Sequence, residues 1–145
     1  MLMSIEIEGS LGAKREELEP VLDHCGLVGI FSPQDNALFA TGLTGLLKMQ
    51  TRGNDGAGVV AINANHEVVV HKGQGMIPEV FTEEVFEDWG KVRAQTFIYQ
   101  VRYGTSGEFS QSNVQPFVCT HNSGDVFVVA HNGQFALENH PFEAS

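Results

Sequence analysis

The sequence has few of the residues that mark several large classes of protein. Its 145 residues include two cysteines, Cys25 and Cys119, too few for the disulfide framework of a small secreted domain. Eight basic residues stand against 18 acidic ones, a formal net charge of −10, whereas a surface that follows nucleic-acid phosphates needs the opposite balance. No uncharged apolar stretch approaches the ~20 residues of a membrane-spanning helix. We therefore expect a cytoplasmic protein that binds neither nucleic acid nor membrane.

The rest of the composition suits one folded domain preceded by an acidic extension. Hydrophobic residues make up 42% of the chain and charged residues 18%, which is enough for a core. Residues 1–24 are acidic, and they lack both the basic-then-apolar pattern of a secretory signal and the arginine-rich pattern of a mitochondrial presequence. The composition changes abruptly at Cys25. We expect 1–24 to be a leader or propeptide and 25–145 to form the domain.

Short apolar runs predict the strands. The run 25–31 combines β-branched residues with glycines, which is typical of a buried strand with close neighbours. Segments 57–62 and 67–71 are expected to pair around a turn at 63–66, and 72–75 to interrupt the structure. A further strand is expected at 96–101. The unbroken apolar run at 126–130 predicts a strand buried on both faces.

Two segments have a helical period. Apolar residues recur close to every 3.6 positions in 36–50, after a turn at 32–35 in which Asp35 is a candidate N-cap. Pro78 is well placed to start a second helix, whose apolar side continues to Trp89. Short strands alternating with helices and strand pairs indicate an α+β layered domain.

Five short segments carry residues suited to chemistry, and each also has a purely structural interpretation. Cys25 could be a small buried hydrophobe, and 52–56 a loop that uses its glycines. Segment 102–107 could be a turn with a surface arginine, and 113–117 an extended connector. Segment 131–133 contains Asn-Gly, a strong signal for a hairpin turn.

In order and spacing, these segments together resemble the glutaminase domain of class II glutamine amidotransferases, which have an N-terminal-nucleophile hydrolase fold. The Gly73-Gln74-Gly75 loop with Val80-Phe81, and the Gln115-Pro116-Phe117 segment, favour the amidophosphoribosyltransferase branch of that family. The resemblance covers residues 25 to about 135 and implies an αββα sandwich. Because Ser145 comes before the last elements of that family's domain, we expect this chain to hold the N-terminal portion.

The resemblance implies a role for each site residue. Cys25 would be the nucleophile, with its own α-amine as the base once the leader is removed, and the thiol could itself excise that leader. Asn132 and Gly133 would donate hydrogen bonds to the oxyanion, through a side-chain amide and a backbone N–H. Arg102 would hold the glutamine α-carboxylate as a planar fork, with help from the Thr105 hydroxyl. The supporting residues would be Arg52, Gly53 and Asp55.

The implied activity is the release of ammonia from glutamine through a Cys25 thioester. The ammonia would go to an acceptor, phosphoribosyl diphosphate in the closest branch, on a synthase or phosphoribosyltransferase domain or subunit; a homo-oligomer is a further expectation. We expect no cofactor, and no metal, because Cys119, His121 and His131 lack a zinc spacing. The alternative is a non-catalytic binding or regulatory module derived from a glutaminase, or an inactive fragment. Thr51 and Gly56 favour it, because the family usually has His and Ser there.

Overall fold

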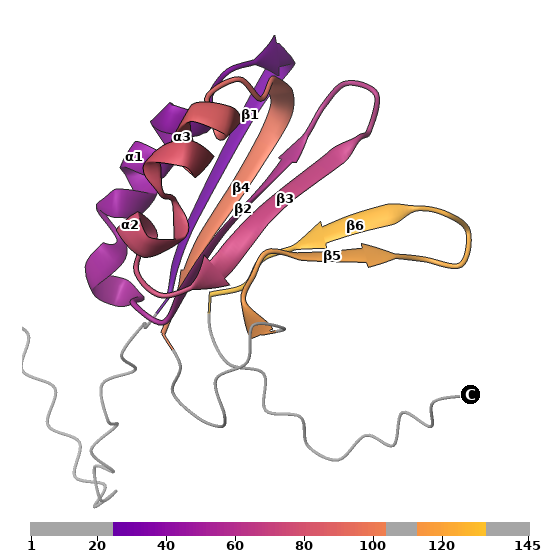
Figure 1. Ribbon diagram of the computed structural model, residues 1–145. Coiled ribbons are helices and arrows are strands. Elements are labelled where there is room, and N and C mark those ends of the chain that lie inside the picture. The colour runs from indigo at the N-terminus through magenta and orange to yellow at the C-terminus, as the bar shows by residue number, and fades with distance from the viewer. Residues whose placement is uncertain (1–24, 104–112, 133–145) are drawn as a thin grey trace, which may run out of the picture.

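The computed structural model describes residues 25–103 and 113–132, which form one four-stranded sheet, three short helices and a separate hairpin (Figure 1). The predictions that concern 1–24, Thr105 and Gly133 lie outside these residues. Every pairing in the four-stranded sheet is antiparallel, in the order β1-β4-β2-β3, and β5 pairs with β6. In chain order the elements are β1 (Gly26–Asn36), α1 (Phe39–Leu47), the 3-10 turn η1 (Gln50–Arg52), β2 (Gly56–Ile62), β3 (Val68–Gln74), α2 (Ile77–Val80), α3 (Glu83–Trp89), β4 (Ala94–Arg102), β5 (Phe117–Thr120) and β6 (Val126–Val129).

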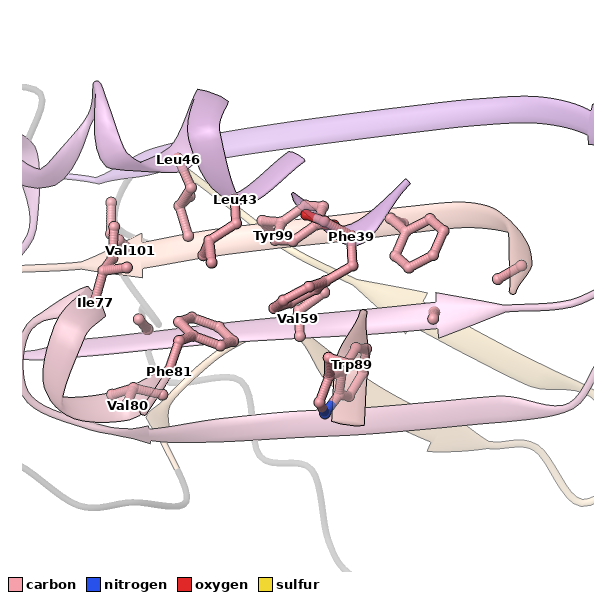
Figure 2. Packing of buried hydrophobic residues seen from close by; sticks show 14 residues of the cluster. Phe39, Leu43, Leu46, Val59, Ile77, Val80, Phe81, Trp89, Tyr99 and Val101 are labelled. Atoms are coloured by element: carbon pink, nitrogen blue, oxygen red, sulfur yellow. The ribbon is translucent and has the colours of Figure 1, made fainter. Parts of the chain in front are cut away.

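The three helices cover one face of the sheet and enclose the core (Figure 1). Alternate residues of the central strands β2 and β4 point toward the helices, so that Val59 and Tyr99 are fully buried there. Phe39 of α1 lies at the centre, with its ring 5.9 Å from that of Phe81 and 5.6 Å from that of Trp89 (Figure 2). The Tyr99 hydroxyl donates to the Phe39 carbonyl oxygen at 2.9 Å, which satisfies a polar group inside the core.

The opposite face of the sheet carries the 113–117 segment and the hairpin that follows it. Gly58 of β2 lies directly beneath this segment, because a Cβ added there would be 2.2 Å from the Gln115 carbonyl oxygen. Lys72 of β3 donates from Nζ to the Val114 carbonyl at 2.8 Å and to the Pro116 carbonyl at 3.5 Å. The same Nζ is 5.3 Å from the centre of the Phe117 ring. The α+β prediction is thus confirmed, with one helical layer, the main sheet and a hairpin on its far side.

The first strand and helix depart from the expected boundaries. β1 continues through the expected turn at 32–35 to Asn36, with an irregular register between Phe31 and Asn36 where Asn36 Nδ2 donates to Ser32 Oγ. The Asp35 N-cap prediction is wrong: its Oδ1 accepts from the Ala64 backbone N–H at 2.9 Å, joining two loops. Helix α1 therefore begins at Phe39 without a side-chain cap, and it ends at Leu47 rather than continuing to residue 50.

The later elements differ from the sequence-based expectations in three ways. β3 includes most of 72–75, the expected interruption, because pairing with β2 continues to Gln74. The helix expected from Pro78 is two helices, since the Thr82 hydroxyl caps a new start by accepting from Val85 N–H. The strand at 126–130 is not buried on both faces: Phe127 is 54% exposed, because β6 lies outside the main sheet and pairs with β5, a strand that the sequence did not predict. Among the described helices, none is long and apolar enough to cross a membrane.

Candidate active site

The predicted site residues gather at the end of the sheet where β1 begins and β4 ends. Gly26 is paired with Val101, so the antiparallel register, continued by one residue, sets Cys25 opposite Arg102. On its other side Arg102 is paired with Gly56 of β2. Cys25 has a free thiol and is 8% exposed. A thiol and a guanidinium that lie far apart in the sequence are therefore brought to neighbouring positions at this end of the sheet.

The 52–56 loop packs directly on the backbone of Arg102. A Cβ added to Gly53 would lie 2.8 Å from both the nitrogen and the carbonyl carbon of Arg102, and equally close to the Val101 carbonyl carbon. Asp55 N–H donates to the Arg102 carbonyl oxygen at 3.0 Å, and its own carbonyl accepts from Gly75 N–H at 3.1 Å. Glycine at position 53 thus permits a contact that fixes the end of β4. Gly53 and Asp55 support Arg102 through the backbone.

Arg102 also connects the sheet to the 113–117 segment. Its Nη1 donates to the Asn113 carbonyl oxygen at 2.7 Å, and its side chain is partly exposed. A guanidinium has five N–H donors in a planar fork that matches a carboxylate, and the bond to the Asn113 carbonyl helps to orient that fork. The geometry is compatible with the carboxylate-binding role that the sequence predicts.

Asn132 is positioned through the residue before it. Gln100 Nε2 donates to the His131 carbonyl oxygen at 2.9 Å, and His131 N–H donates to Gln115 Oε1 at 2.6 Å. Gln100 and Arg102 are two residues apart on β4 and point to the same face, so their Cα atoms are about 7 Å apart. The anchored peptide therefore lies near the Cys25–Arg102 pair, and the Asn132 side chain is exposed.

Three glutamines and a lysine to which the sequence analysis gave no role in the site complete this region. Gln50 accepts from Ile77 N–H at 2.8 Å and donates to the Gly53 carbonyl, which ties α2 to the 52–56 loop. Gln100 is fully buried between Tyr99 and Val101, and a polar residue among buried apolar ones is a signal that could have been used. Gln115 and Lys72 hold the connector described above, and their partners are distant in sequence.

No candidate metal centre accompanies these groups in 25–103 or 113–132. Cys119 is exposed on β5, and the His121 ring contacts the Ser123 hydroxyl at 2.8 Å in the hairpin turn. His131 follows β6, the second strand of the hairpin, and two hydrogen bonds hold its backbone N–H and carbonyl.

Comparison with known proteins identifies the family. The pattern of the glutamine amidotransferases of class II matches residues 25–144. The chain belongs to the class II glutamine amidotransferases. Its relatives include amidophosphoribosyltransferases from Methanothermobacter thermautotrophicus, 35% identical over 114 residues, and from Vigna aconitifolia, 39% identical over 116 residues. Each comparison covers 78% of this chain but only 23% and 22% of the relative.

A solved structure shows the same relationship in three dimensions. The allosteric regulatory enzyme of purine biosynthesis superposes with a TM-score of 0.57 at 32% identity, over 70% of this chain and 21% of that one. Both the class II family and the amidophosphoribosyltransferase branch that the motifs favoured are thus confirmed, as is the fold. The chain spans less than a quarter of the length of these relatives. Residues 25–144 are a glutamine amidotransferase domain.

Proposed function

We propose that this domain hydrolyses glutamine and releases ammonia, with Cys25 as nucleophile. The observation that carries the proposal is the strand register that sets Cys25 opposite Arg102 in a class II glutamine amidotransferase domain. A thiol and a guanidinium in adjacent positions suit a substrate with an amide at one end and an α-carboxylate at the other.

The reaction proceeds through a thioester. Cys25 Sγ attacks the carboxamide carbon of glutamine, and its proton passes to the Cys25 α-amine, directly or through a water molecule. That proton then goes to the departing nitrogen, which leaves as ammonia while the thioester remains. Water next attacks the thioester carbon, giving glutamate and the free thiol. No cofactor is needed for either step.

The other site residues stabilise charge or hold the substrate. The Asn132 side-chain amide and the Gly133 N–H donate to the oxyanion that forms in each attack. Arg102 binds the α-carboxylate with its planar fork, and the Thr105 hydroxyl adds a hydrogen bond. Gly53 and Asp55 fix the backbone of Arg102, and Arg52 orders the same loop.

Several broader features of the proposal follow from the family. Residues 1–24 act as a propeptide, and removal of them by Cys25 frees the α-amine. The ammonia passes to phosphoribosyl diphosphate on an acceptor domain or subunit. The reaction takes place in the cytoplasm and belongs to purine synthesis, and the protein assembles into a homo-oligomer. The amidophosphoribosyltransferase names of the relatives support the acceptor. Apart from Thr51 and Gly56, no observation on the described residues favours the alternative of a non-catalytic module.

Substitution of Cys25 tests the proposal directly. Cys25→Ala should abolish glutamine hydrolysis and leave residues 1–24 attached, while glutamine binding by calorimetry stays close to that of the parent chain. Cys119→Ala is the matched control, because it removes an exposed thiol on β5 and should change neither activity nor intact mass beyond the substitution itself. Arg102→Lys should instead mainly weaken binding, because the fork is lost while the charge stays. Activity that survives in Cys25→Ala would refute the proposal.

A further inference from the structure

Two glutamine side chains hold opposite ends of the same stretch of backbone just before Asn132. Gln115 Oε1 accepts from His131 N–H at 2.6 Å, and Gln100 Nε2 donates to the His131 carbonyl oxygen at 2.9 Å. His131 comes two residues after the end of β6, so its backbone groups are not held by the hairpin ladder. The two glutamines supply those hydrogen bonds instead.

Both glutamines are themselves held in place. Gln100 is fully buried in the middle of β4, between Leu27 of β1 and Gly58 of β2. Gln115 is held on both sides, because Lys72 Nζ donates to the carbonyls of Val114 and Pro116. Its own carbonyl rests on Gly58, where a side chain would not fit. Both glutamine side chains therefore extend from backbone that the main sheet holds in place.

We propose that Gln100 and Gln115 form a clamp that positions Asn132 for glutamine hydrolysis. The inference rests on the proposed function. An oxyanion donor contributes fully only when its amide is already oriented, and Asn132 is exposed and has little packing of its own. Fixing the N–H and C=O of the preceding residue, His131, restricts the backbone that carries the Asn132 side chain. The two glutamines are positioning residues, since they act through His131 and Asn132.

Gln100 also has an energetically unfavourable feature. Its Oε1 is buried without a hydrogen-bond partner in the described part of the chain. A leucine would avoid that unsatisfied acceptor, so packing alone does not explain an amide at this position. The hydrogen bond from Nε2 to the His131 carbonyl does explain it.

The test shortens each glutamine side chain by one methylene group. Gln115→Asn and Gln100→Asn retain an amide but withdraw it from His131, whereas Gln115→Glu keeps an acceptor oxygen at the original reach. Gln95→Asn is the control, because Gln95 is also on β4 and donates to the Pro33 carbonyl at the far end of the strand. Two quantities are measured on the full chain: the hydrogen-exchange rate of the His131 amide by NMR, and the steady-state kinetics of glutamine hydrolysis.

Gln115→Asn should exchange the His131 amide about tenfold faster, because the acceptor of that N–H is gone. Both Gln→Asn variants at the clamp should lower kcat about tenfold and leave the KM for glutamine within about twofold, since a displaced oxyanion donor affects the transition state. Gln115→Glu should keep the exchange of the His131 amide close to that of the parent, and Gln95→Asn should stay close to the parent in both measurements. If one clamp variant does not fold, the other decides the kinetic result.

Unchanged exchange in Gln115→Asn would show that the clamp does not exist. Faster exchange with an unchanged kcat would show that the clamp holds His131 without positioning Asn132, and a rise in KM alone would assign it to substrate binding; either result overturns the inference. A parent chain that hydrolyses no glutamine would overturn the proposed function itself, and with it the catalytic role of the clamp.

Discussion

Replacing Gly53 by alanine should perturb both stability and substrate binding through a single contact. The added Cβ would lie 2.8 Å from three backbone atoms of Val101 and Arg102, at least 0.6 Å closer than the 3.4 Å at which ordinary contact begins. Backbone in a central strand cannot rotate away as a flexible side chain can, so either the loop or the end of β4 must move. Overpacking of this kind costs about 1–3 kcal/mol in the free energy of unfolding, and each kcal/mol lowers Tm by about 4–8 °C.

The measurement is urea denaturation together with glutamine kinetics, with Gly29→Ala as the matched control. Gly29 lies in β1 beside the same strand β4, but a Cβ there meets nothing within 4 Å, and the change should be neutral or stabilising by up to about 1 kcal/mol. In Gly53→Ala the KM for glutamine should rise as well, because Arg102 moves with its backbone. The reasoning fails if the two alanine variants unfold at the same urea concentration.

Two further substitutions test separate parts of the molecule. Asn132→Gly keeps a turn-forming residue but removes the side-chain donor, so turnover should fall about 10²-fold or more with glutamine affinity little changed. A variant with unchanged turnover would instead favour the interpretation of Asn132 as only a turn residue. Tyr99→Phe leaves the Phe39 carbonyl without its donor and should cost about 1–3 kcal/mol by denaturation. Burial raises the pKa of Tyr99 above 10.0, so the unfolded chain ionises first and stability falls as the pH rises above about 10. The phenylalanine variant should lose that part of the alkaline decline, and a pH series of melting curves would show whether it does.

Local sequence patterns predicted the elements whose structure depends on local residues. The β2–β3 hairpin follows from short apolar runs around a turn and the helix at Phe39–Leu47 from helical period, and both are present. The boundaries that were wrong depend on distant partners. Asp35 bonds Ala64 rather than capping α1, and β3 continues to Gln74 because β2 offers it a partner. An apolar run alone also could not show that β6 stands outside the main sheet.

The residues of the candidate site also fall into two groups, those that the sequence revealed and those that only the fold reveals. Cys25, Arg102 and Asn132 were found because ordered motifs resemble those of a known family. Gln100 and Gln115 were not assigned a role, because their importance comes from a shared partner, His131, that is close only after folding. The contact between Gly53 and Arg102 is likewise invisible in a sequence, since a glycine in a polar loop has many local explanations.

The strand order has a consequence for when the site can exist. The β2–β3 hairpin can form from neighbouring residues, but β1 pairs with β4, whose last residues were synthesised long after Cys25. While the chain emerges from the ribosome, Cys25 therefore has no neighbour on the sheet until Val101 and Arg102 have been added. Closing that long loop has an entropic cost, and it brings Cys25 and Arg102 together in a single step. Because of this strand order, the reactivity of Cys25 would indicate that folding of the main sheet is complete.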